Sequence, residues 1–483
     1  MVPLLGAFLA SVLGWYRAKL AYTVTLASVG FSLAASVTVL VDVLRNGDVQ
    51  YRLGGWAPPI GIEVAIDPLS AFVAVVVTAV ALIVLVPSRQ LMANELPAGG
   101  GGPYASVVLL LMAGLTGIII TGDLFNLFVF LEIASLAAYA LVAVGGGKAT
   151  VSGFRYLILG TIGGSFYLLG VGLIYFMTGT LNMADAARLL PEVQNTTTIV
   201  AAVVLITTGL GLKMALFPLH QWLPDAYAYA PSAVSALIAP IVTKVYAYAL
   251  IRMYLSVFPP SYITDVLPIS TVLVILGMTG IVFGSVMAFA QQDIRRMLAY
   301  SSISQLAFIA LGIGLANSLA LIGAVLHIMN HAVMKACLFL AVGSIRRQAG
   351  TASIPQLAGL GRRMPLTMGA FTVGALSMIG VPPSSGFFSK WYLIQGGIDA
   401  SNWAAVAVIL ISSLLTAVYF FKVLEKIYFG IPEHSQNEAV NEAPAILVIP
   451  TWVFAIAMVA LGVVNAFVVS GILDKAIGPN WGI

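Results

Sequence analysis

The chain alternates long apolar runs with short polar connections over its whole length. A helix that crosses a bilayer needs about 20 mostly apolar residues, and no connection is long enough to form a soluble domain. The pattern predicts an all-α integral membrane protein with about 14 transmembrane helices. The predicted spans lie near residues 3–16, 20–44, 65–86, 104–121, 124–144, 153–177, 197–218, 232–252, 266–289, 298–315, 318–344, 366–396, 404–428 and 446–471.

The N-terminal apolar run, residues 3–13, allows two interpretations. It resembles the core of a signal peptide, but no basic residue precedes it and no clear cleavage site follows. We therefore favour a short first membrane helix, or one shortened by a mis-set start, over a cleaved signal peptide.

Basic residues are distributed unevenly between the two sets of alternating connections. Cytoplasmic connections of membrane proteins carry an excess of Lys and Arg. With the N-terminus outside, the inner set holds 13 basic residues and the outer set five. The inner set is Arg17, Lys19, Arg89, Lys148, Arg155, Arg295, Arg296, Arg346, Arg347, Arg362, Arg363, Lys422 and Lys426, and the outer set is Arg45, Arg52, Arg188, Arg252 and Lys475. This bias predicts an even number of spans and both termini on the outer face.

Composition narrows the possible functions. The chain is 60% hydrophobic and 8% charged, whereas about a quarter of the residues of a soluble protein are charged. The formal charge of +4 is small and scattered, so we expect no nucleic-acid partner. One cysteine, Cys337, excludes an internal disulfide, and the sequence has no CxxC pair, zinc-type spacing, GxGxxG or P-loop. We therefore expect no cofactor, metal or nucleotide site on this chain.

Seven ionisable side chains fall inside predicted spans. A charged residue at the centre of a membrane helix costs about 2.5–3.5 kcal/mol on insertion scales and normally faces protein or a wet cavity. One such group could be a structural ion pair or a lysine that reaches the interface, but seven on five spans favour a path for protons or small cations. The seven candidate residues are Glu132, Lys213, Lys244, His327, His331, Lys335 and Lys390.

Prolines accompany two of these lysines. Pro218 follows Lys213, and Pro382 and Pro383 precede Lys390. Proline removes a helix hydrogen bond and breaks or kinks the helix, and a broken membrane helix is tolerated where it lines a hydrated cavity. The two affected spans are five apart, which predicts two inverted five-helix repeats. We place these repeats at residues 104–255 and 266–428, with further helices in residues 1–103 and 446–483.

His327, His331 and Lys335 are spaced by four residues and so share one helix face. Histidine titrates near neutral pH, so a row of such groups can relay protons. Two alternatives are a hydrogen-bonded helix contact and a haem or metal pair. The second is disfavoured because neither a carboxylate nor a third ligand accompanies the histidines.

Five stretches resemble a known family. They are TGDLFNLFVFLEIASLAAYAL (121–141), LKMALFPLHQWLPDAYAYAPSAVSALIAPIVTKVYAYALIR (212–252), QQDIRRMLAYSSISQLAF (291–308), HIMNHAVMKACLFL and GVPPSSGFFSKW. The chain resembles, over about residues 60–430, the proton-conducting membrane proteins shared by Mrp-type cation/proton antiporters, membrane-bound hydrogenases and complex I. Gly122, Asp123 and Lys390 look most like the D-type Mrp subunit. Tyr227 departs from the histidine that complex I members often have there.

The resemblance implies a fold and a route. It implies fourteen helices, two inverted repeats and a polar axis at mid-membrane, in a prokaryotic inner membrane and among other membrane subunits. Glu132 and Lys213 would form an interacting pair. Lys244 would pass protons through His331 and Lys335 to Lys390.

Three functions fit that resemblance. They are a subunit of a monovalent cation/proton antiporter, a pumping subunit of a redox complex, and an inert membrane scaffold. The intramembrane charges argue against the scaffold.

Overall fold

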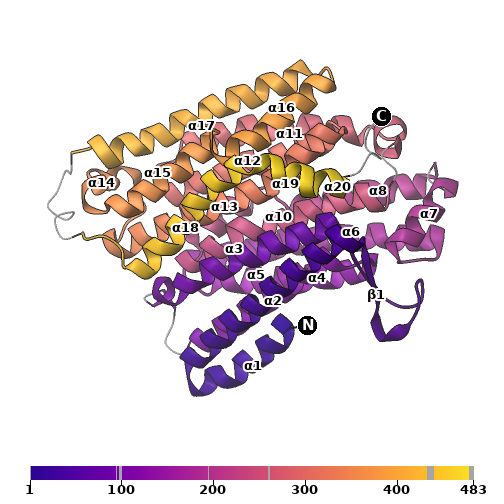
Figure 1. The fold of residues 1–483 in the computed structure, drawn as a ribbon, viewed down its shortest axis with the longest axis horizontal. Coiled ribbons are helices and arrows are strands. Elements are labelled where there is room, and N and C mark those ends of the chain that lie inside the picture. Colours follow the sequence, from indigo (N-terminus) through magenta and orange to yellow (C-terminus); the bar gives the residue numbers. More distant parts are fainter. Residues whose placement is uncertain are drawn as a thin grey trace.

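The computed structural model describes residues 2–93, 95–96, 100–193, 195–258, 261–431 and 440–477, and these form an almost entirely helical bundle (Figure 1). The elements are α1 (Val2–Tyr16), α2 (Ala18–Asn46), β1 (Val49–Arg52), β2 (Glu63–Ile66), α3 (Pro68–Met92), α4 (Gly101–Ile120), α5 (Leu124–Ala143), α6 (Lys148–Thr178), α7 (Met183–Val193), α8 (Thr197–Lys213), α9 (Leu223–Tyr229), α10 (Ser232–Ser256), α11 (Ile269–Phe289), α12 (Ile294–Gly314), α13 (Ser318–Ala349), α14 (Leu360–Arg363), α15 (Pro365–Ile379), α16 (Ser385–Asp399), α17 (Trp403–Phe429), α18 (Ala445–Val463), α19 (Asn465–Val468) and α20 (Asp474–Ile477).

The predicted membrane helices are present. Among the described residues, 11 helices are long and apolar enough to cross a bilayer, and α1, α8 and α15 are shorter apolar helices. The two predicted breaks also occur, because α8 stops before α9 begins and α15 stops before α16 begins. Counting each broken pair as one span, these elements account for the fourteen predicted spans, and the all-α membrane class is confirmed.

Several boundaries differ from the prediction. Helix α3 continues through Pro87 to Met92, and Tyr22 donates there to the carbonyl oxygens of Leu85 and Val86, 3.1 and 2.5 Å away. Helix α10 runs on to Ser256, so Arg252 belongs to a helix and not to a connection. That arginine is buried and paired with the carboxylate of Asp67, which removes the cost of extending the helix past a charge.

Other basic residues expected in connections also lie on helices. Lys148 and Arg155 are in α6, Arg295 and Arg296 are in α12, and Arg346 and Arg347 are in the last turn of α13. Cations are favourable at a helix C-terminus, where the unpaired carbonyl groups carry negative partial charge. Helix α13 is therefore able to extend beyond residue 344 before it ends at Gly350, which has a left-handed φ of 68°.

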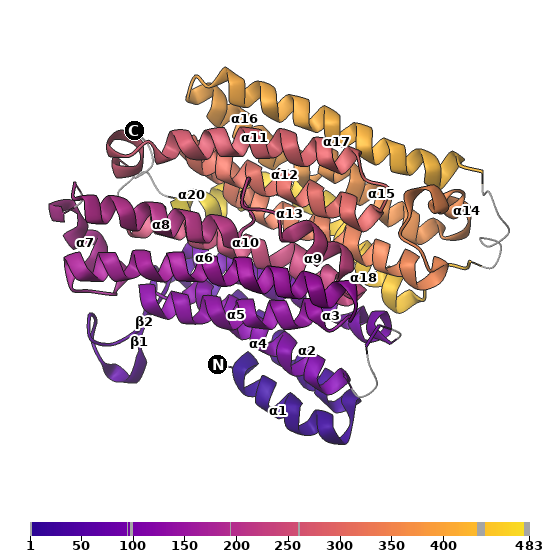
Figure 2. The ribbon, with the colours of Figure 1, turned by 180° about the vertical axis from the view of Figure 1, so that it is seen from behind.

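A short β-hairpin lies outside the helical bundle and was not predicted. Strands β1 and β2 pair antiparallel, with Val49 opposite Ile66 and Arg52 opposite Glu63. Each strand has only four residues, too few for a hydropathy pattern. The hairpin and α7 lie at one end of the bundle, and α14 lies at the other (Figure 2).

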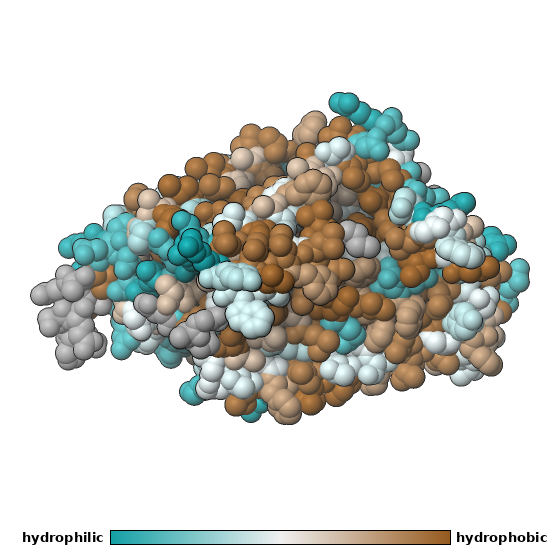
Figure 3. Space-filling view, turned by 90° about the horizontal axis from the view of Figure 1, so that it is seen from below, coloured by the Kyte–Doolittle hydropathy of each residue, from teal (hydrophilic) through white to brown (hydrophobic). Residues whose placement is uncertain are grey.

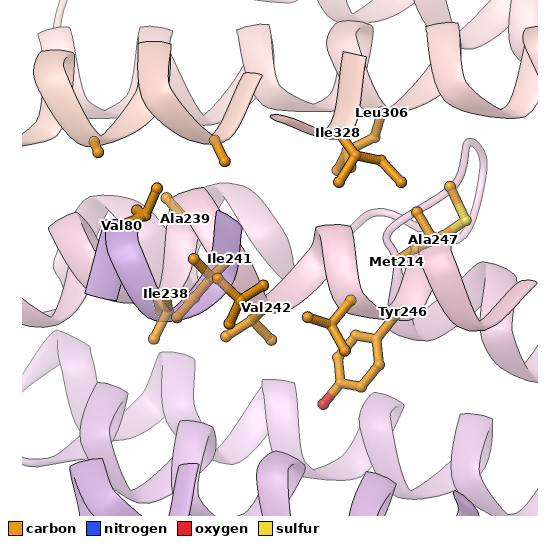
Figure 4. Packing of buried hydrophobic residues seen from close by; sticks show 14 of the residues in the cluster. Val80, Met214, Ile238, Ala239, Ile241, Val242, Tyr246, Ala247, Leu306 and Ile328 are labelled. Atoms are coloured by element: carbon orange, nitrogen blue, oxygen red, sulfur yellow. The ribbon is translucent and has the colours of Figure 1, made fainter. Parts of the chain in front are cut away.

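Three helices form the centre of the bundle. The apolar windows of α10 and α13 are fully buried and that of α12 is 94% buried, whereas that of α2 is 17% buried. The buried cluster in Figure 4 includes Ile241 and Tyr246 of α10, Leu306 of α12 and Ile328 of α13. Most candidate site residues lie on these central helices or pack against them.

The surface has the pattern of a membrane protein. Hydrophobic residues cover the middle of the face in Figure 3, and hydrophilic residues gather toward both ends. Val2 lines a cavity with Ile66 and Ile120, and Lys475 donates to the carbonyl oxygen of Leu44 at 3.4 Å. The first and the last described residues therefore lie near the end of the helical bundle that carries the hairpin.

The packing order is similar in the two predicted repeats. In the first, α4 packs on α5, α5 on α6 and α6 on α8. In the second, α11 packs on α12, α12 on α13, and α13 on α15 and α16. This is the order that a repeat requires, and the division at residues 104–255 and 266–428 stays a prediction.

Candidate functional site

Glu132 and Lys213 form an ion pair between α5 and the C-terminal end of α8. The Lys213 Nζ lies 3.0 Å from the Glu132 Oε1, and it also donates to Ser135 Oγ at 2.7 Å and Tyr139 Oη at 3.3 Å. The lysine side chain is fully buried, while the glutamate side chain is 23% exposed. The carboxylate is thus the member of the pair that other groups can reach.

Gly164 of α6 makes room for this pair. A Cβ atom at that position would lie 2.2 Å from the Glu132 Oε1, far inside contact distance. Only a residue without a side chain leaves the carboxylate where it meets Lys213. The position is therefore part of the site although it carries no chemistry.

The break after α8 begins at Lys213. Ala215 takes a left-handed φ of 60°, which is uncommon for a residue with a side chain. Trp222 donates its indole N–H to the carbonyl oxygen of Leu212 at 3.0 Å, so the returning chain satisfies a group that the helix end leaves free. The break places Lys213 at the end of a helix inside the bundle.

Lys244, on α10, has no carboxylate partner among the described residues. Its Nζ donates to the carbonyl oxygen of Ala239 at 2.6 Å and to Thr243 Oγ1 at 3.5 Å. The side chain is fully buried, and it is close enough to His331 and Lys335 to interact with their charges. No hydrogen bond in the described part of the chain joins Lys244 to either of them.

The histidine face of α13 is oriented toward α12 and α16. The rings of His327 and His331 are 5.6 Å apart, and His327 Nδ1 lies 2.9 Å from Ser389 Oγ. Neither ring nitrogen of His331 has a hydrogen-bond partner in the described part of the protein. Lys335 donates to the carbonyl oxygen of Leu298 at 2.7 Å and to Ser301 Oγ at 2.5 Å.

Lys390, on α16, reaches the second break. Its Nζ lies 3.0 Å from the carbonyl oxygens of Met378 and Ile379, at the end of α15, and 3.2 Å from Ser413 Oγ. It also lies 5.5 Å from the centre of the Phe308 ring, which is 5.6 Å from the His327 ring. Phe308 therefore lies near both His327 and Lys390.

The four buried lysines differ in the groups that accept hydrogen bonds from their ammonium groups. Lys213 faces a carboxylate, whereas Lys244, Lys335 and Lys390 donate to carbonyl and hydroxyl oxygens. A buried ion pair is costly to break because the remaining charge loses its partner. A lysine bonded to neutral oxygens leaves no such charge behind, so it can lose its proton and regain it. The arrangement suits transfer from one paired lysine to three unpaired ones.

The sequence prediction missed neutral polar groups on α12 and α13, the helices that contain or contact the histidines and Lys335. Gln305 is fully buried on α12, and neither polar atom of its amide has a partner among the described residues. The same holds for Asn330 Oδ1 and His327 Nε2. Buried polar groups normally bond to protein or to water, so these atoms are free to accept further hydrogen-bond partners. An amide carries no charge, so it does not stand out in an apolar span as an ionisable residue does.

His220 was also missed, because it follows Pro218 in the break. It lines a cavity of about 390 Å³ with Gln221, Asp225, Arg296 and Tyr300. The cavity lies beside the break that starts at Lys213.

Asp225 joins the two predicted repeats. This residue of α9 pairs with Arg155 of α6 and with Arg296 of α12, each at 3.2 Å. Arg295 of α12 is buried and donates to Ser235 Oγ at 2.8 Å, and to the carbonyl oxygens of Tyr227 and Ala230 at the end of α9. The start of α12 thus holds the end of α9 and the first turn of α10.

Arg295→Met is expected to destabilise the protein. It removes the arginine donor from the carbonyl oxygens of Tyr227 and Ala230. Ser235 Oγ still donates to Tyr227 at 2.8 Å, but the buried Ala230 carbonyl keeps only a 3.5 Å contact, and an unsatisfied buried group costs about 1–3 kcal/mol. The melting temperature of the purified protein is to be measured. Arg295→Lys, which keeps the charge but not the several N–H donors of the guanidinium group, is expected to be intermediate. Arg362→Met at an exposed position is the control, and an Arg295→Met protein as stable as this control would contradict the role.

A known family matches most of this region. The family model for the NADH:quinone oxidoreductase/Mrp antiporter transmembrane region matches residues 121–416. The chain is 46% identical over 471 residues to NADH-quinone oxidoreductase subunit N of Desulforudis audaxviator, and the match covers 93% of both chains. It is 33% identical over 448 residues to the D subunit of the Na(+)/H(+) antiporter of Alkalihalophilus pseudofirmus, and this match covers 92% of this chain and 88% of the relative.

Solved structures of membrane complexes contain chains with the same fold. A chain of the Mrp complex from Dietzia superposes with a TM-score of 0.90 at 28% identity, covering 100% of this chain and 96% of the other. A chain of the membrane-bound sulfane sulfur reductase, an archaeal respiratory membrane complex, superposes with a TM-score of 0.91 at 32% identity, covering 99% and 96%. The protein is therefore a multi-pass, proton-translocating membrane subunit with partner membrane subunits. It belongs to the NADH:quinone oxidoreductase/Mrp antiporter family.

Proposed function

We propose that this chain is the D-type subunit of a multisubunit monovalent cation/proton antiporter, with Na⁺ as the cation. The observation that supports it best is the contrast between one lysine paired to a carboxylate and three lysines that donate only to neutral oxygens. The 33% identity to the D subunit of a Na(+)/H(+) antiporter points to the same class of complex.

In this proposal the Glu132–Lys213 ion pair controls proton transfer along a row of residues, which we call the proton row. It consists of Lys213, Lys244, His331, Lys335 and Lys390. While Glu132 is charged and faces Lys213, the lysine keeps its proton. When a cation or proton reaches the partly exposed Glu132 carboxylate, its attraction for Lys213 falls and Lys213 releases its proton toward Lys244. His331 and Lys335 pass it on, and Lys390 at the second break is the last member. Each step changes which of two neighbouring groups carries the charge.

A second candidate is a pumping subunit of a redox complex. The 46% identity to a protein named for NADH-quinone oxidoreductase favours it, and so does the likeness to a sulfane sulfur reductase chain. In that complex the same row would move protons, and electron transfer in partner subunits would supply the energy.

One reconstitution separates the candidates. The purified parent complex is placed in liposomes containing a pH-sensitive dye, and either a Na⁺ gradient or a reductant with quinone is supplied. Proton movement driven by Na⁺ alone supports the antiporter, and movement that requires the reductant supports the redox complex.

The chain alone is expected to exchange Na⁺ for protons at less than about a tenth of the rate of the complex, a difference of about 1.4 kcal/mol in the barrier. The reason is that the sequence carries ion-path residues but no energy-input motif. The same dye assay measures both preparations. Robust exchange by the single chain would contradict the need for partners.

We further propose that the protein lies in a prokaryotic inner membrane with both termini outside, from the excess of basic residues in the inner connections. Arg362→Cys is expected to react with an impermeant maleimide only from the cytoplasm, and Asp474→Cys only from outside. Both positions are exposed, and the native Cys337 is buried, so background labelling is low. Labelling of Arg362→Cys from outside would reverse the orientation.

A further inference from the structure

Another cavity lies away from the proton row, where α3 ends and α4 begins. It has a volume of about 340 Å³ and opens between α2, α3 and α4. Its lining includes the apolar Leu85, Met92 and Leu96 and the hydroxyl-bearing Tyr22 and Tyr104. The wall therefore combines apolar and polar groups, as a site for an amphipathic ligand does.

Aromatic residues mark this end as a membrane boundary. Trp15 is 93% exposed and Tyr16 is 79% exposed, and both lie at the end of α1, just before the turn into α2. Exposed tryptophan and tyrosine gather at the level of lipid headgroups. Ala18, which follows this turn, lines the cavity, so the cavity lies at headgroup depth.

One basic residue lines the cavity, and two more are next in sequence to a residue that lines it. Arg89 lines it, and Arg17 and Lys19 flank Ala18, which also lines it. All three are exposed, and none forms an ion pair within the described ranges. The nearby carboxylate of Glu95 is occupied by Arg346 and by Ser232. Positive charge without a counterion therefore borders a cavity at the membrane surface.

We propose that this cavity binds one anionic phospholipid, such as phosphatidylglycerol. The phosphate would lie against Arg89 within reach of Arg17 and Lys19, with the glycerol region beside Tyr104. Basic pockets between membrane helices bind anionic headgroups in this way. The cavity is smaller than a whole lipid, so the acyl chains extend along the exposed side of α2, whose apolar window is only 17% buried.

Native mass spectrometry of the delipidated complex tests this proposal. Phosphatidylglycerol and phosphatidylcholine with identical acyl chains are titrated separately. Tighter binding of phosphatidylglycerol is expected, and Arg89→Gln is expected to weaken it about five-fold, since one basic residue near a membrane surface contributes about 1 kcal/mol. Arg45→Gln, which removes an exposed charge at the other end of α2, is the control and is expected to leave binding unchanged.

Other outcomes would overturn it. Equal binding of the two lipids, or equal loss in Arg89→Gln and Arg45→Gln, would mean a nonspecific lipid shell. Inorganic phosphate is the final competitor to be tested, because it carries the negative charge of the headgroup without the acyl chains. If phosphate at millimolar concentration displaces phosphatidylglycerol completely, the apolar wall contributes nothing and the site is for a free anion. Arg89 lies on the surface outside the proton row, so a failure here leaves the proposed transport function untouched.

Discussion

Glu132→Gln is expected to reduce proton transport by the assembled complex to below about 1% of the wild-type rate, a rise of about 2.7 kcal/mol in the barrier. The substitution keeps the shape of the side chain and removes the charge that Lys213 faces at 3.0 Å. Loss of one member of a buried ion pair costs about 3–5 kcal/mol, so Lys213 cannot hold and release its proton in the same cycle. Dye-reported pH change in proteoliposomes measures the rate.

The matched control is Glu192→Gln, which makes the same change at an exposed position on α7. It is expected to transport normally, and both variants are to be checked for complete assembly. Lys213→Ala is expected to behave like Glu132→Gln, and Lys213→Arg to keep the pair but not the exchange, because arginine does not deprotonate. Wild-type transport by a fully assembled Glu132→Gln complex would remove the ion pair from the mechanism.

His331→Ala is expected to lower transport at least about ten-fold, more than His327→Ala does. Both ring nitrogens of His331 are free of hydrogen bonds among the described residues, and its ring lies next to His327 and within charge range of Lys244. His327, in contrast, already shares a hydrogen bond with Ser389. The middle ring is thus the one best placed to accept a proton and pass it on.

His331→Lys is the sharper companion variant. It restores a proton-carrying group but adds a cation one helical turn from Lys335, so it is not expected to restore transport. Proton uptake by the reconstituted complex distinguishes these cases. If His331→Ala transports normally, the histidines only hold helices together, and the path between the halves runs elsewhere, through water and Ser301, Ser302 and Ser304.

Much of the fold could be predicted because membrane helices show in the sequence as long apolar runs. The spans and both breaks follow from hydropathy and from Pro218, Pro382 and Pro383. The β-hairpin could not be found this way, since strands of four residues carry no such pattern. The passage of α3 through Pro87 depends on a neighbouring helix, because Tyr22 donates to carbonyl groups beside the proline.

The sequence identifies the ionisable residues of the candidate site but few of their partners. The resemblance implied that Glu132 and Lys213 interact, and the two side chains lie 3.0 Å apart. The oxygens that Lys335 and Lys390 contact belong to the main chain of Leu298, Met378 and Ile379. Every residue has a carbonyl group, so no sequence pattern tells which one a lysine will reach. Their positions follow only from how α12, α13, α15 and α16 pack.

The double contact of Asp225 limits how the protein can move. One carboxylate on the seven-residue helix α9 holds an arginine from each predicted repeat, and Arg295 fastens the end of the same helix from the second repeat. Transporters that rock one repeat against the other need a surface along which the repeats slide. Here such sliding would break, in every cycle, the contacts that Arg295 and Arg296 of the second predicted repeat make with the first. These contacts favour a mechanism in which charge passes between fixed groups over one in which the two predicted repeats rock against each other.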